Sequence, residues 1–328
     1  MGTLFCIGEV LIDFIPLQKG KALKDVETFE RAPGGAPANV AATVATFEGK
    51  SSMITKLGKD AFGDFLVEKL NQSGVQTDYI CRTEEANTAL AFVSLREDGE
   101  RDFSFYRKPS ADLLLTEAEI NGEWFNKGDI LHFGSVDLVE SPMKQAHRKA
   151  IEQAEQKGTL ISFDPNVRLP LWEDHECCRQ TILDFVPRAH ILKISDEELF
   201  FITKINDVEE AIQSLFIGNV KAVLFTKGSL GADLYLKNEK FESKGYRVTV
   251  QDTTGAGDAF IGGFLYQLLE KQVNQTNLDS VCRTYQKTLL KFANAAGALT
   301  TTGKGAISSI PTKKLVMKLI GDKTGGEN

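Results

Sequence analysis

The 328-residue chain has no long hydrophobic run, and this limits where it can work. No apolar stretch reaches the ~18 residues that a membrane-spanning helix needs. The apolar N-terminal segment is interrupted by Glu9 and Asp13, which is not typical of a signal peptide. The five cysteines include no C-x-x-C pair, so neither a zinc site nor a disulfide framework is indicated. We therefore expect a cytoplasmic protein with reduced cysteines.

The chain also has fewer basic than acidic residues, and it lacks the two common nucleotide-binding loops. Lys and Arg number 38 against 45 Asp and Glu, which gives a net charge of −7, and they form no stripe. This balance argues against nucleic acid as the main partner. The pattern G-x-x-x-x-G-K-[ST] does not occur, and Phe260 stands where a dinucleotide-binding loop needs its third glycine. Any nucleotide must therefore be bound by another kind of loop.

Alternating periodicity fills most of the chain. Its length and its 42% hydrophobic content allow one large domain with an appendage, or two domains. Buried strands are expected at residues 4–8, 53–57, 129–133, 159–164, 191–194 and 222–226. Helices are expected at residues 35–46, 61–73, 142–156, 175–185, 208–217, 256–269 and 285–299. The alternation predicts a mostly parallel sheet with helices on both faces.

The strongest candidate for chemistry is Asp252-Thr-Thr-Gly-Ala-Gly-Asp258, which opens into an apolar helical pattern. The first N–H groups of a helix have no partner within it, so such a junction binds anions. Gly255 and Gly257 let the backbone approach a ligand closely. Asp258 would repel a bound anion unless it acts beside it, as a general base does in phosphoryl transfer. Taken alone, the motif also fits an ordinary helix start with a favourable acidic residue.

A second glycine motif, Gly34-Gly-Ala-Pro-Ala-Asn39, precedes another helical pattern. Gly34 and Gly35 permit a close approach, and the Asn39 amide can donate to and accept from neighbouring sugar hydroxyls. Asp13 is expected to end the first strand, at the sheet edge where α/β proteins bind ligands. A solvent-facing Asn and an ordinary turn residue are the alternatives for these two positions.

Together the two motifs resemble the signature sequences of the ribokinase-like (PfkB) sugar kinases, and the resemblance runs from Gly8 to Pro311. Glu48 departs from the pattern, since the family usually has Gly or Ser there. Residues 36–38, Arg107 and Arg168 resemble the fructokinases of this family. The resemblance implies a three-layer α/β/α fold with a mostly parallel central sheet and a small β-sheet lid. It also implies transfer of the γ-phosphoryl group of ATP to the 6-hydroxyl of D-fructose.

The resemblance further implies the site residues. Asp258 is the base, and the backbone of Gly255, Ala256 and Gly257 stabilises charge. The sugar side comprises Asp13, Gly34, Gly35, Asn39, Tyr106, Arg107, Asp164, Asn166 and Arg168. The ATP side comprises Lys193, Ser195, Glu198, Thr226, Lys227, Gly228, Gly231 and Asn294. Ser195 replaces the Asn of the family's N-x-x-E motif, whereas Glu198 retains its role beside Mg²⁺ and acts through water. A monovalent cation such as K⁺ is expected at Asp252, Thr254, Thr300, Gly303, Gly305 and Ser309.

A hairpin is expected at residues 89–95 and 101–106, joined across residues 97–100, with Phe103 and Phe105 on one face. Since no helices accompany it, we expect a separate small sheet, with an extension of the main sheet as the alternative. Such a sheet could close over the site as a lid, and its apolar face could form a homodimer contact. The expected division is a core of residues 1–11, 31–87 and 108–328 and a lid of residues 12–30 and 88–107.

Two other functions stay open. The first is another sugar or sugar-acid kinase, above all a 2-keto-3-deoxygluconate kinase, which a substrate panel would separate. The second is a non-catalytic protein that senses sugar or nucleotide on the same fold. Fructose binding without turnover would favour the second.

Overall fold

The computed structural model describes residues 2–18, 20–95 and 101–324 of the chain, and its centre is a 9-stranded sheet. The strand order is β13-β12-β11-β10-β9-β8-β1-β4-β5. All neighbours from β5 across to β11 are parallel, while β12 and β13 are antiparallel at one edge. The bounds are β1 Thr3–Ile7, β4 Lys50–Gly58, β5 Ile80–Thr83, β8 Ile130–Phe133, β9 Leu160–Phe163, β10 Ile191–Ser195, β11 Ala222–Thr226, β12 Gly231–Leu236 and β13 Glu239–Lys244.

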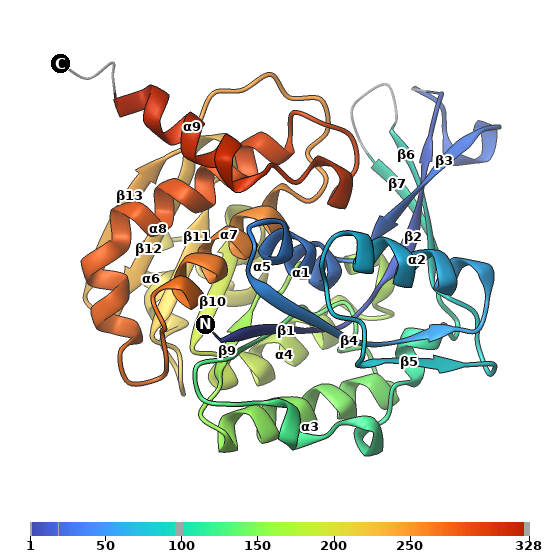
Figure 1. Cartoon of the computed structure of the whole chain (residues 1–328), viewed down its shortest axis with the longest axis horizontal. Helices are drawn as coiled ribbons and strands as arrows, with labels where there is room; N and C mark the ends of the chain where they lie inside the picture. Colours follow the sequence, from blue (N-terminus) through green and yellow to red (C-terminus); the bar gives the residue numbers. More distant parts are fainter. Residues whose placement is uncertain (1, 19, 96–100, 325–328) are drawn as a thin grey trace.

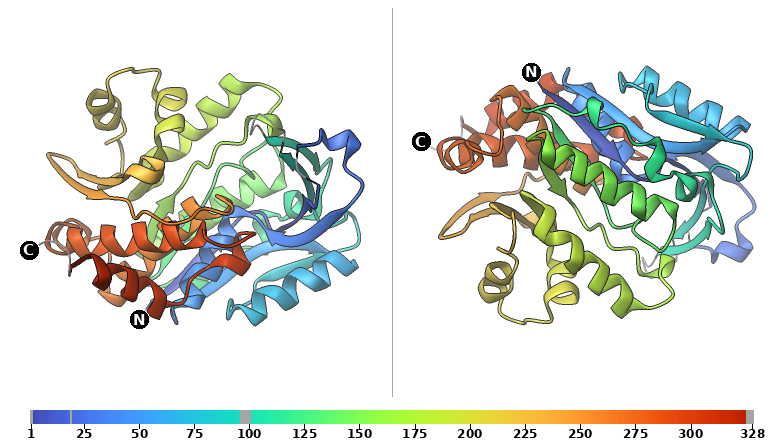
Figure 2. Two further views of the ribbon diagram at one scale, coloured as in Figure 1. Left: turned by 90° about the horizontal axis from the view of Figure 1, so that it is seen from above. Right: turned by 90° about the horizontal axis from the view of Figure 1, so that it is seen from below.

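Helices cover both faces of this sheet, as Figures 1 and 2 show. Successive β1 side chains enter opposite cores: Leu4 and Cys6 pack on one face, Phe5 and Ile7 on the other. One face carries α1 (Ala36–Thr46), α2 (Ala61–Gln72), α7 (Ala256–Glu270), α8 (Leu278–Thr300) and α9 (Lys313–Thr324). The other carries α3 (Pro142–Gln156), α4 (His175–Phe185), α5 (Asp196–Thr203) and α6 (Val208–Ser214). The predicted three-layer α/β/α fold is confirmed.

A separate 4-stranded sheet stands beside the core, which confirms the prediction of a small second sheet. Its order is β3-β2-β6-β7, and the bounds are β2 Leu11–Pro16, β3 Phe29–Gly34, β6 Leu90–Leu95 and β7 Arg101–Tyr106. β6 and β7 form the expected antiparallel hairpin. Its connecting residues 97–100 and the side chain of Phe103 lie outside the described part. Phe105 packs inward against Leu11, Ala89 and Ala91.

The expected place of Asp13 is wrong. β1 ends at Ile7, and Asp13 lies inside β2 of the small sheet, paired with Ala32 of β3. The chain leaves the main sheet at Gly8, whose φ of 147° suits glycine, and enters the small sheet within a few residues. The division into core and lid stays a prediction, although the small sheet provides its physical basis.

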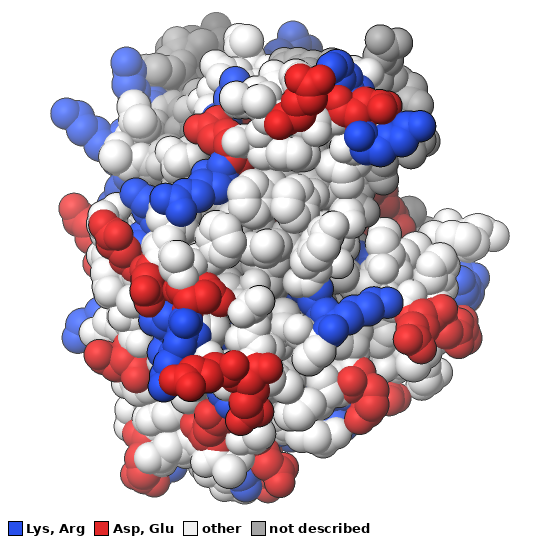
Figure 3. Space-filling model, turned by 90° about the vertical axis from the view of Figure 1, so that its right-hand side faces the viewer, with Lys and Arg blue, Asp and Glu red and all other residues white. Residues whose placement is uncertain are grey.

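The opposite face of the small sheet is rich in aromatic rings. Phe14 stacks on Phe92 with ring centroids 4.6 Å apart, and Phe29 and Tyr106 lie edge-on to Phe92 at 5.4 and 5.3 Å. Figure 3 views the molecule from the side that carries this sheet, and uncharged surface crosses its middle between charged margins. Among the described residues, no helix is both long and apolar enough to cross a membrane.

Candidate active site

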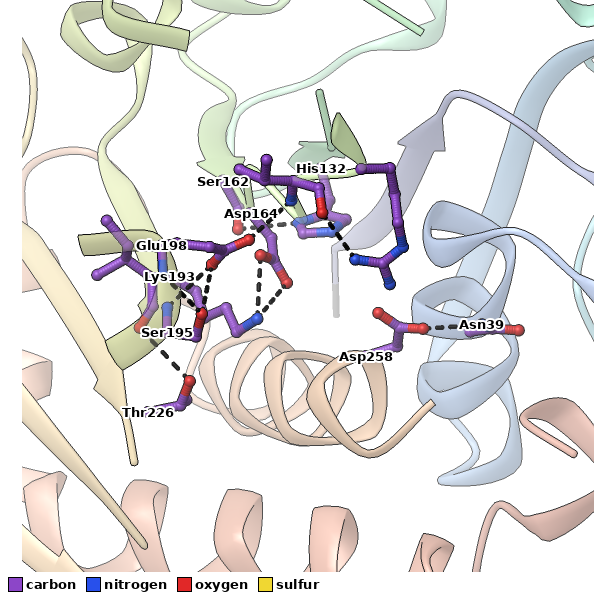
Figure 4. Close-up of polar contacts among 12 residues, drawn as sticks. Asn39, His132, Ser162, Asp164, Lys193, Ser195, Glu198, Thr226 and Asp258 are labelled. Atoms are coloured by element: carbon purple, nitrogen blue, oxygen red, sulfur yellow. Dashed lines mark hydrogen bonds and ion pairs between the residues drawn. The ribbon is translucent and has the colours of Figure 1, made fainter. Parts of the chain in front are cut away.

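The site is centred on the first turn of α7, where the Asp258 carboxylate meets Asn39 of α1. Asn39 Nδ2 donates to Asp258 Oδ2 at 2.8 Å (Figure 4). Gly255 precedes α7 with φ 78° and ψ 0°, and a Cβ there would lie 2.7 Å from the Cβ of Ala306. Only glycine fits this position, because both the backbone conformation and the neighbouring loop exclude a side chain. The two glycine motifs, distant in sequence, therefore form one site.

The environment of Asp258 suits a proton acceptor. Loss of water around its carboxyl raises its pKa above the ordinary value, although the residue as a whole is half-buried. The hydrogen bond from Asn39 and the positive charges of Lys193 and Arg168 act in the opposite direction. A carboxylate with a raised pKa holds a proton more readily, as a general base must.

An ion pair lies beside this turn. Lys193 Nζ is 3.0 Å from Asp164 Oδ2, and both side chains are buried. A Cβ added to Gly257 would lie 3.3 Å from Lys193 Nζ, so this ammonium group lies beside the first turn of α7. Burial raises the pKa of Asp164 to about 7, Lys193 opposes that rise, and Glu198 and Asp258 add to it. The pair brings a positive charge to the place where an anion would bind.

A buried histidine backs this ion pair without adding charge. His132 Nδ1 lies 3.0 Å from Ser162 Oγ, as Figure 4 shows. Burial, with the nearby Lys193, lowers the pKa of His132 to about 3. Its imidazole is therefore neutral at physiological pH and adds no charge to the site.

Glu198 holds a loop rather than standing open. Its Oε2 accepts from Ser195 N at 2.9 Å and its Oε1 from Val167 N at 2.8 Å. Burial alone would raise its pKa, but Lys193 and these hydrogen bonds lower it overall. Ser195 caps α5 in the same arrangement, with its Oγ accepting from Glu198 N. The capping box thus fixes the segment on which Asn166 and Arg168 lie.

Arg168 and Asn166 flank Val167 in this segment. Arg168 Nη1 donates to the carbonyl of Val167 at 3.0 Å, and its charge is near enough to Asp258 to lower that group's pKa. Asn166 adopts a left-handed backbone with φ 45°. The predicted sugar residue Arg168 is therefore placed on the same side as the base.

Three further predicted sugar residues meet where the small sheet joins α1. A Cβ on Gly34 would lie 2.1 Å from Asp13 Oδ2, so the Asp13 carboxylate rests against this glycine. Gly35 has φ 107°, and a Cβ there would lie 2.3 Å from the carbonyl oxygen of Glu9. Both glycines are required because their surroundings leave no room for a side chain. Tyr106, by contrast, is 63% exposed on the aromatic face of the small sheet.

Arg107 is buried and its guanidinium is already paired. Its Nη2 donates to both Asp112 and Asp137. Burial would lower its pKa, but these carboxylates and Glu9 raise it overall. The structure does not leave this side chain open toward a ligand, and its direct contact with the sugar stays a prediction. Sequence reasoning missed Glu9, Asp112 and Asp137; acidic residues just after buried strands were the available signal.

The residues expected on the ATP side fall into two groups. Some form the end of β11 and the turn after it, and others make side-chain contacts within the protein. Thr226 ends β11 beside β10, and its Oγ1 donates to the Ile194 carbonyl at 3.4 Å, close to Ser195 in Figure 4. Gly228 and Gly231 form the turn that follows, with φ of 52° and 106°. Two other side chains are used within the protein: Lys227 Nζ lies 2.6 Å from Asp233, and Asn294 Nδ2 donates to the Ser243 carbonyl at 3.2 Å.

The residues expected around a monovalent cation lie in two joined loops. Asp252 Oδ1 accepts from Thr254 N at 3.0 Å, and Oδ2 accepts from Gly305 N at 3.0 Å. A Cβ on Gly303 would lie 2.5 Å from Ser309 Oγ, while Thr300 Oγ1 donates to the Ala296 carbonyl. Within the described ranges no cluster of three or more His, Cys, Asp or Glu residues is arranged to hold a metal ion.

Known proteins resemble this chain along its whole length. Fructokinase-2 of Solanum lycopersicum is 44% identical over 320 residues, which cover 97% of this chain and 96% of the relative. The crystal structure of a fructokinase with bound ATP from Xylella fastidiosa matches with a TM-score of 0.90 and 36% identity, covering 98% and 99% of the two chains.

A second solved structure is a double mutant of the fructokinase from Vibrio cholerae O395 with fructose, ADP and potassium ion. Its TM-score is 0.87 at 33% identity, and 98% of each chain is covered. The family model for pfkB carbohydrate kinases matches residues 1–313. With the anion-binding turn, the neighbouring carboxylate and the two-sheet fold in place, the chain belongs to the pfkB family of carbohydrate kinases.

Proposed function

We propose that this kinase is an ATP-dependent fructokinase that transfers the γ-phosphoryl group of ATP to the 6-hydroxyl of D-fructose. The contact between Asn39 and Asp258 at the first turn of α7 carries the proposal, because it joins a hydroxyl-binding amide, a base and an anion site. The names of the similar proteins support fructose as the acceptor.

In the proposed mechanism, Asp13, the Gly34–Gly35 turn and Asn39 hold the sugar hydroxyls, with Arg168 on the side of the base. The hydroxyl oxygen attacks the γ-phosphorus while Asp258 accepts the hydroxyl proton, and ADP leaves. First-turn N–H groups of α7, from Gly255 to Asp258, donate to the transferring group, since charge spreads over its oxygens in the transition state. The small sheet excludes water, which would otherwise compete as acceptor.

For the cofactors we propose Mg²⁺ with ATP, and K⁺ in the loop of Asp252. When bound, Mg²⁺ neutralises charge on the ATP phosphates. Both Glu198 oxygens already accept backbone hydrogen bonds, so this ionised carboxylate would act on Mg²⁺ only through water, with the lone pairs that remain. The carboxylate and carbonyl oxygens of residues 252–254 and 300–309 are of the kind that binds K⁺, and the potassium ion in the Vibrio cholerae structure supports this assignment.

We also infer a homodimer formed through the aromatic face of the small sheet. Tyr106 is 63% exposed there, and a hollow of about 650 Å³ lies between Leu23, Phe29, Phe92 and Tyr106. Phe105 is excluded from this contact, since it packs inward. The cytoplasmic location expected from the sequence stays a prediction.

The substitution Asp258→Asn tests the mechanism. We expect the variant to fold and to bind both ligands, but to lose about 10²- to 10⁴-fold in kcat, because general-base removal has this effect. Coupled ADP detection gives kcat, and thermal unfolding with fructose or ATP gives folding and binding. Turnover near that of the unchanged protein would refute the assignment of the base.

A substrate panel, assayed with and without K⁺, tests the acceptor. Fructose should give the highest kcat/KM among fructose, ribose, 2-keto-3-deoxygluconate and glucose, with product phosphorylated at O6. Preference for 2-keto-3-deoxygluconate would favour the sugar-acid kinase instead. Fructose binding without ADP formation would favour a sensing protein.

A further inference from the structure

One buried arginine is enclosed by carboxylates where the small sheet meets the core. We call Glu9, Arg107, Asp112 and Asp137 the Arg107 cluster. Arg107 pairs with Asp112 and Asp137, and Glu9 interacts electrostatically with both Arg107 and Asp137. All four are at most 5% exposed. A buried network of this kind is costly to break, because loss of one member leaves the others without partners.

The four residues come from different parts of the fold. Glu9 lies between β1 and β2, Arg107 follows β7, Asp112 lies in the short helix Ala111–Leu114, and Asp137 lies between β8 and α3. The cluster therefore joins two of the connections between the small sheet and the core, the β1–β2 segment and the segment after β7, to the loop after β8. It is one of the places where the position of one sheet relative to the other is set.

Glu9 extends this network to the sugar-binding turn. Its Oε1 accepts from the backbone N–H of Ala36 at 2.9 Å, at the first residue of α1. Its own carbonyl oxygen lies beneath Gly35, 2.3 Å from where a Cβ would stand. Asn39, which donates to Asp258, is on the same helical turn. A shift of Glu9 would thus move Gly35, Ala36 and the amide that meets the base.

We propose that Glu9 and Arg107 are positioning residues that lock the Gly34–Asn39 turn to the base of the small sheet, an inference that rests on the proposed fructokinase function. Arg107 acts on the sugar through Glu9 and Ala36 instead of touching it.

The charge state of the cluster agrees with this role. Burial and the neighbouring Asp137 raise the pKa of Glu9 to about 8, against the effect of Arg107. Burial likewise raises the pKa of Asp137 to about 7. The raised pKa of Glu9 favours its neutral, protonated form, which reduces the repulsion between Glu9 and Asp137. Neutral Gln at position 9 should accordingly be tolerated, provided that it still accepts from Ala36 N–H.

The experiment compares Glu9→Met, which removes the acceptor, with Glu9→Gln, which keeps it. Asp129→Leu is the matched control, because it also removes a buried acceptor: Asp129 accepts from Thr3 N at 2.7 Å, but at the opposite end of β1. We measure kcat and KM for fructose and for ATP, together with thermal unfolding. Glu9→Met should lower kcat/KM for fructose about 10- to 100-fold, because small misplacements of binding groups have effects of this size.

The KM for ATP should change less than about twofold in Glu9→Met. Glu9→Gln should retain most of the kcat/KM for fructose that Glu9→Met loses. Asp129→Leu should lose stability without a change in the KM for fructose. The inference is overturned if Glu9→Met leaves kcat/KM for fructose unchanged, or if Glu9→Gln lowers it as much as Glu9→Met does. It is also overturned if Glu9→Met lowers kcat/KM for fructose and for ATP by the same factor, as a general structural defect would.

If Glu9→Met does not fold, Arg107→Lys replaces it with the same expected kinetics, since the Lys side chain is shorter and cannot bring its ammonium nitrogen to the position of Arg107 Nη2. Its failure to alter the KM for fructose would then overturn the inference. The proposed function fails separately, and visibly, if the unchanged protein does not phosphorylate fructose.

Discussion

Lys193 places one ammonium group among the carboxylates of Asp164, Glu198 and Asp258. Burial works against its charge, but the three acids raise its pKa overall, and Asp164 first among them. This residue therefore combines two tasks. It offsets buried negative charge in the folded protein, and it stands where the phosphoryl group would be transferred.

Lys193→Met should lower the free energy of unfolding by about 3–5 kcal/mol, because it leaves Asp164 buried without a counter-charge. The double variant Lys193→Met with Asp164→Leu should regain much of that stability but not the activity. Urea unfolding and the coupled kinase assay measure the two properties separately. An unchanged unfolding midpoint in the single variant would contradict this account.

At the scale of single residues, sequence motifs pointed to two side chains that lie together in the structure. Asp258 and Asn39 were singled out from short motifs, and the structure places them in direct contact. Local motifs could not reveal that the Arg107 guanidinium forms ion pairs with Asp112 and Asp137, because Asp137 lies 30 residues away. Ion pairs of this range depend on how strands are ordered in the sheet, which residue spacing does not encode.

Among the elements, α2 begins at a residue that also ties it to the small sheet. Asp60 Oδ1 accepts from Phe62 N and Gly63 N at 3.0 and 2.8 Å, and Oδ2 accepts from Thr88 N at 2.8 Å, just before β6. Burial would raise its pKa, but these hydrogen bonds lower it overall from 3.8. The folded state therefore binds a proton at Asp60 less readily than the unfolded chain does.

Asp60→Ala should lower the free energy of unfolding by about 1–2 kcal/mol near pH 7, as loss of a helix cap does. Because the folded-state pKa lies below the unfolded one, this stabilisation is fully present above about pH 4 and is lost as the pH falls through the folded value. Urea unfolding of both proteins from pH 3 to pH 8 checks this. A difference that grew toward low pH would have the wrong sign.

Periodicity predicted most helices and parallel strands to within a few residues, since buried strands and amphipathic helices have distinct patterns. It did not find α5 or α9, and it began α8 at residue 285 instead of Leu278. α5 spans only Asp196–Thr203, with acidic residues in its first turn, so its apolar face is too short to stand out. β12 was also missed, because Asp233 interrupts its apolar pattern and is accommodated by Lys227.

At the scale of the whole molecule, we expect the mass of the protein in solution to be that of a dimer. Light scattering should give roughly twice the chain mass of 36.1 kDa. Leu23→Glu should shift the protein toward the monomer, because Leu23 lines the hollow on the aromatic face and a charge would be buried in an apolar contact. Leu315→Glu is the control, since Leu315 is 51% exposed on α9, away from the small sheet in Figure 1. A monomeric unchanged protein would refute the dimer.

The order of strands in the large sheet has a consequence for synthesis. β1 is made before the other strands of this sheet, yet it lies in the interior of the sheet between β4 and β8. Leu4 pairs with Ser51 on one side, but its partner on the other side is Ile130. The nascent chain must therefore keep an apolar strand half-paired while residues 59–129, about a fifth of the chain, are still being made. We expect vectorial folding to begin with β1, α1 and β4 and to stay exposed to aggregation until β8 emerges.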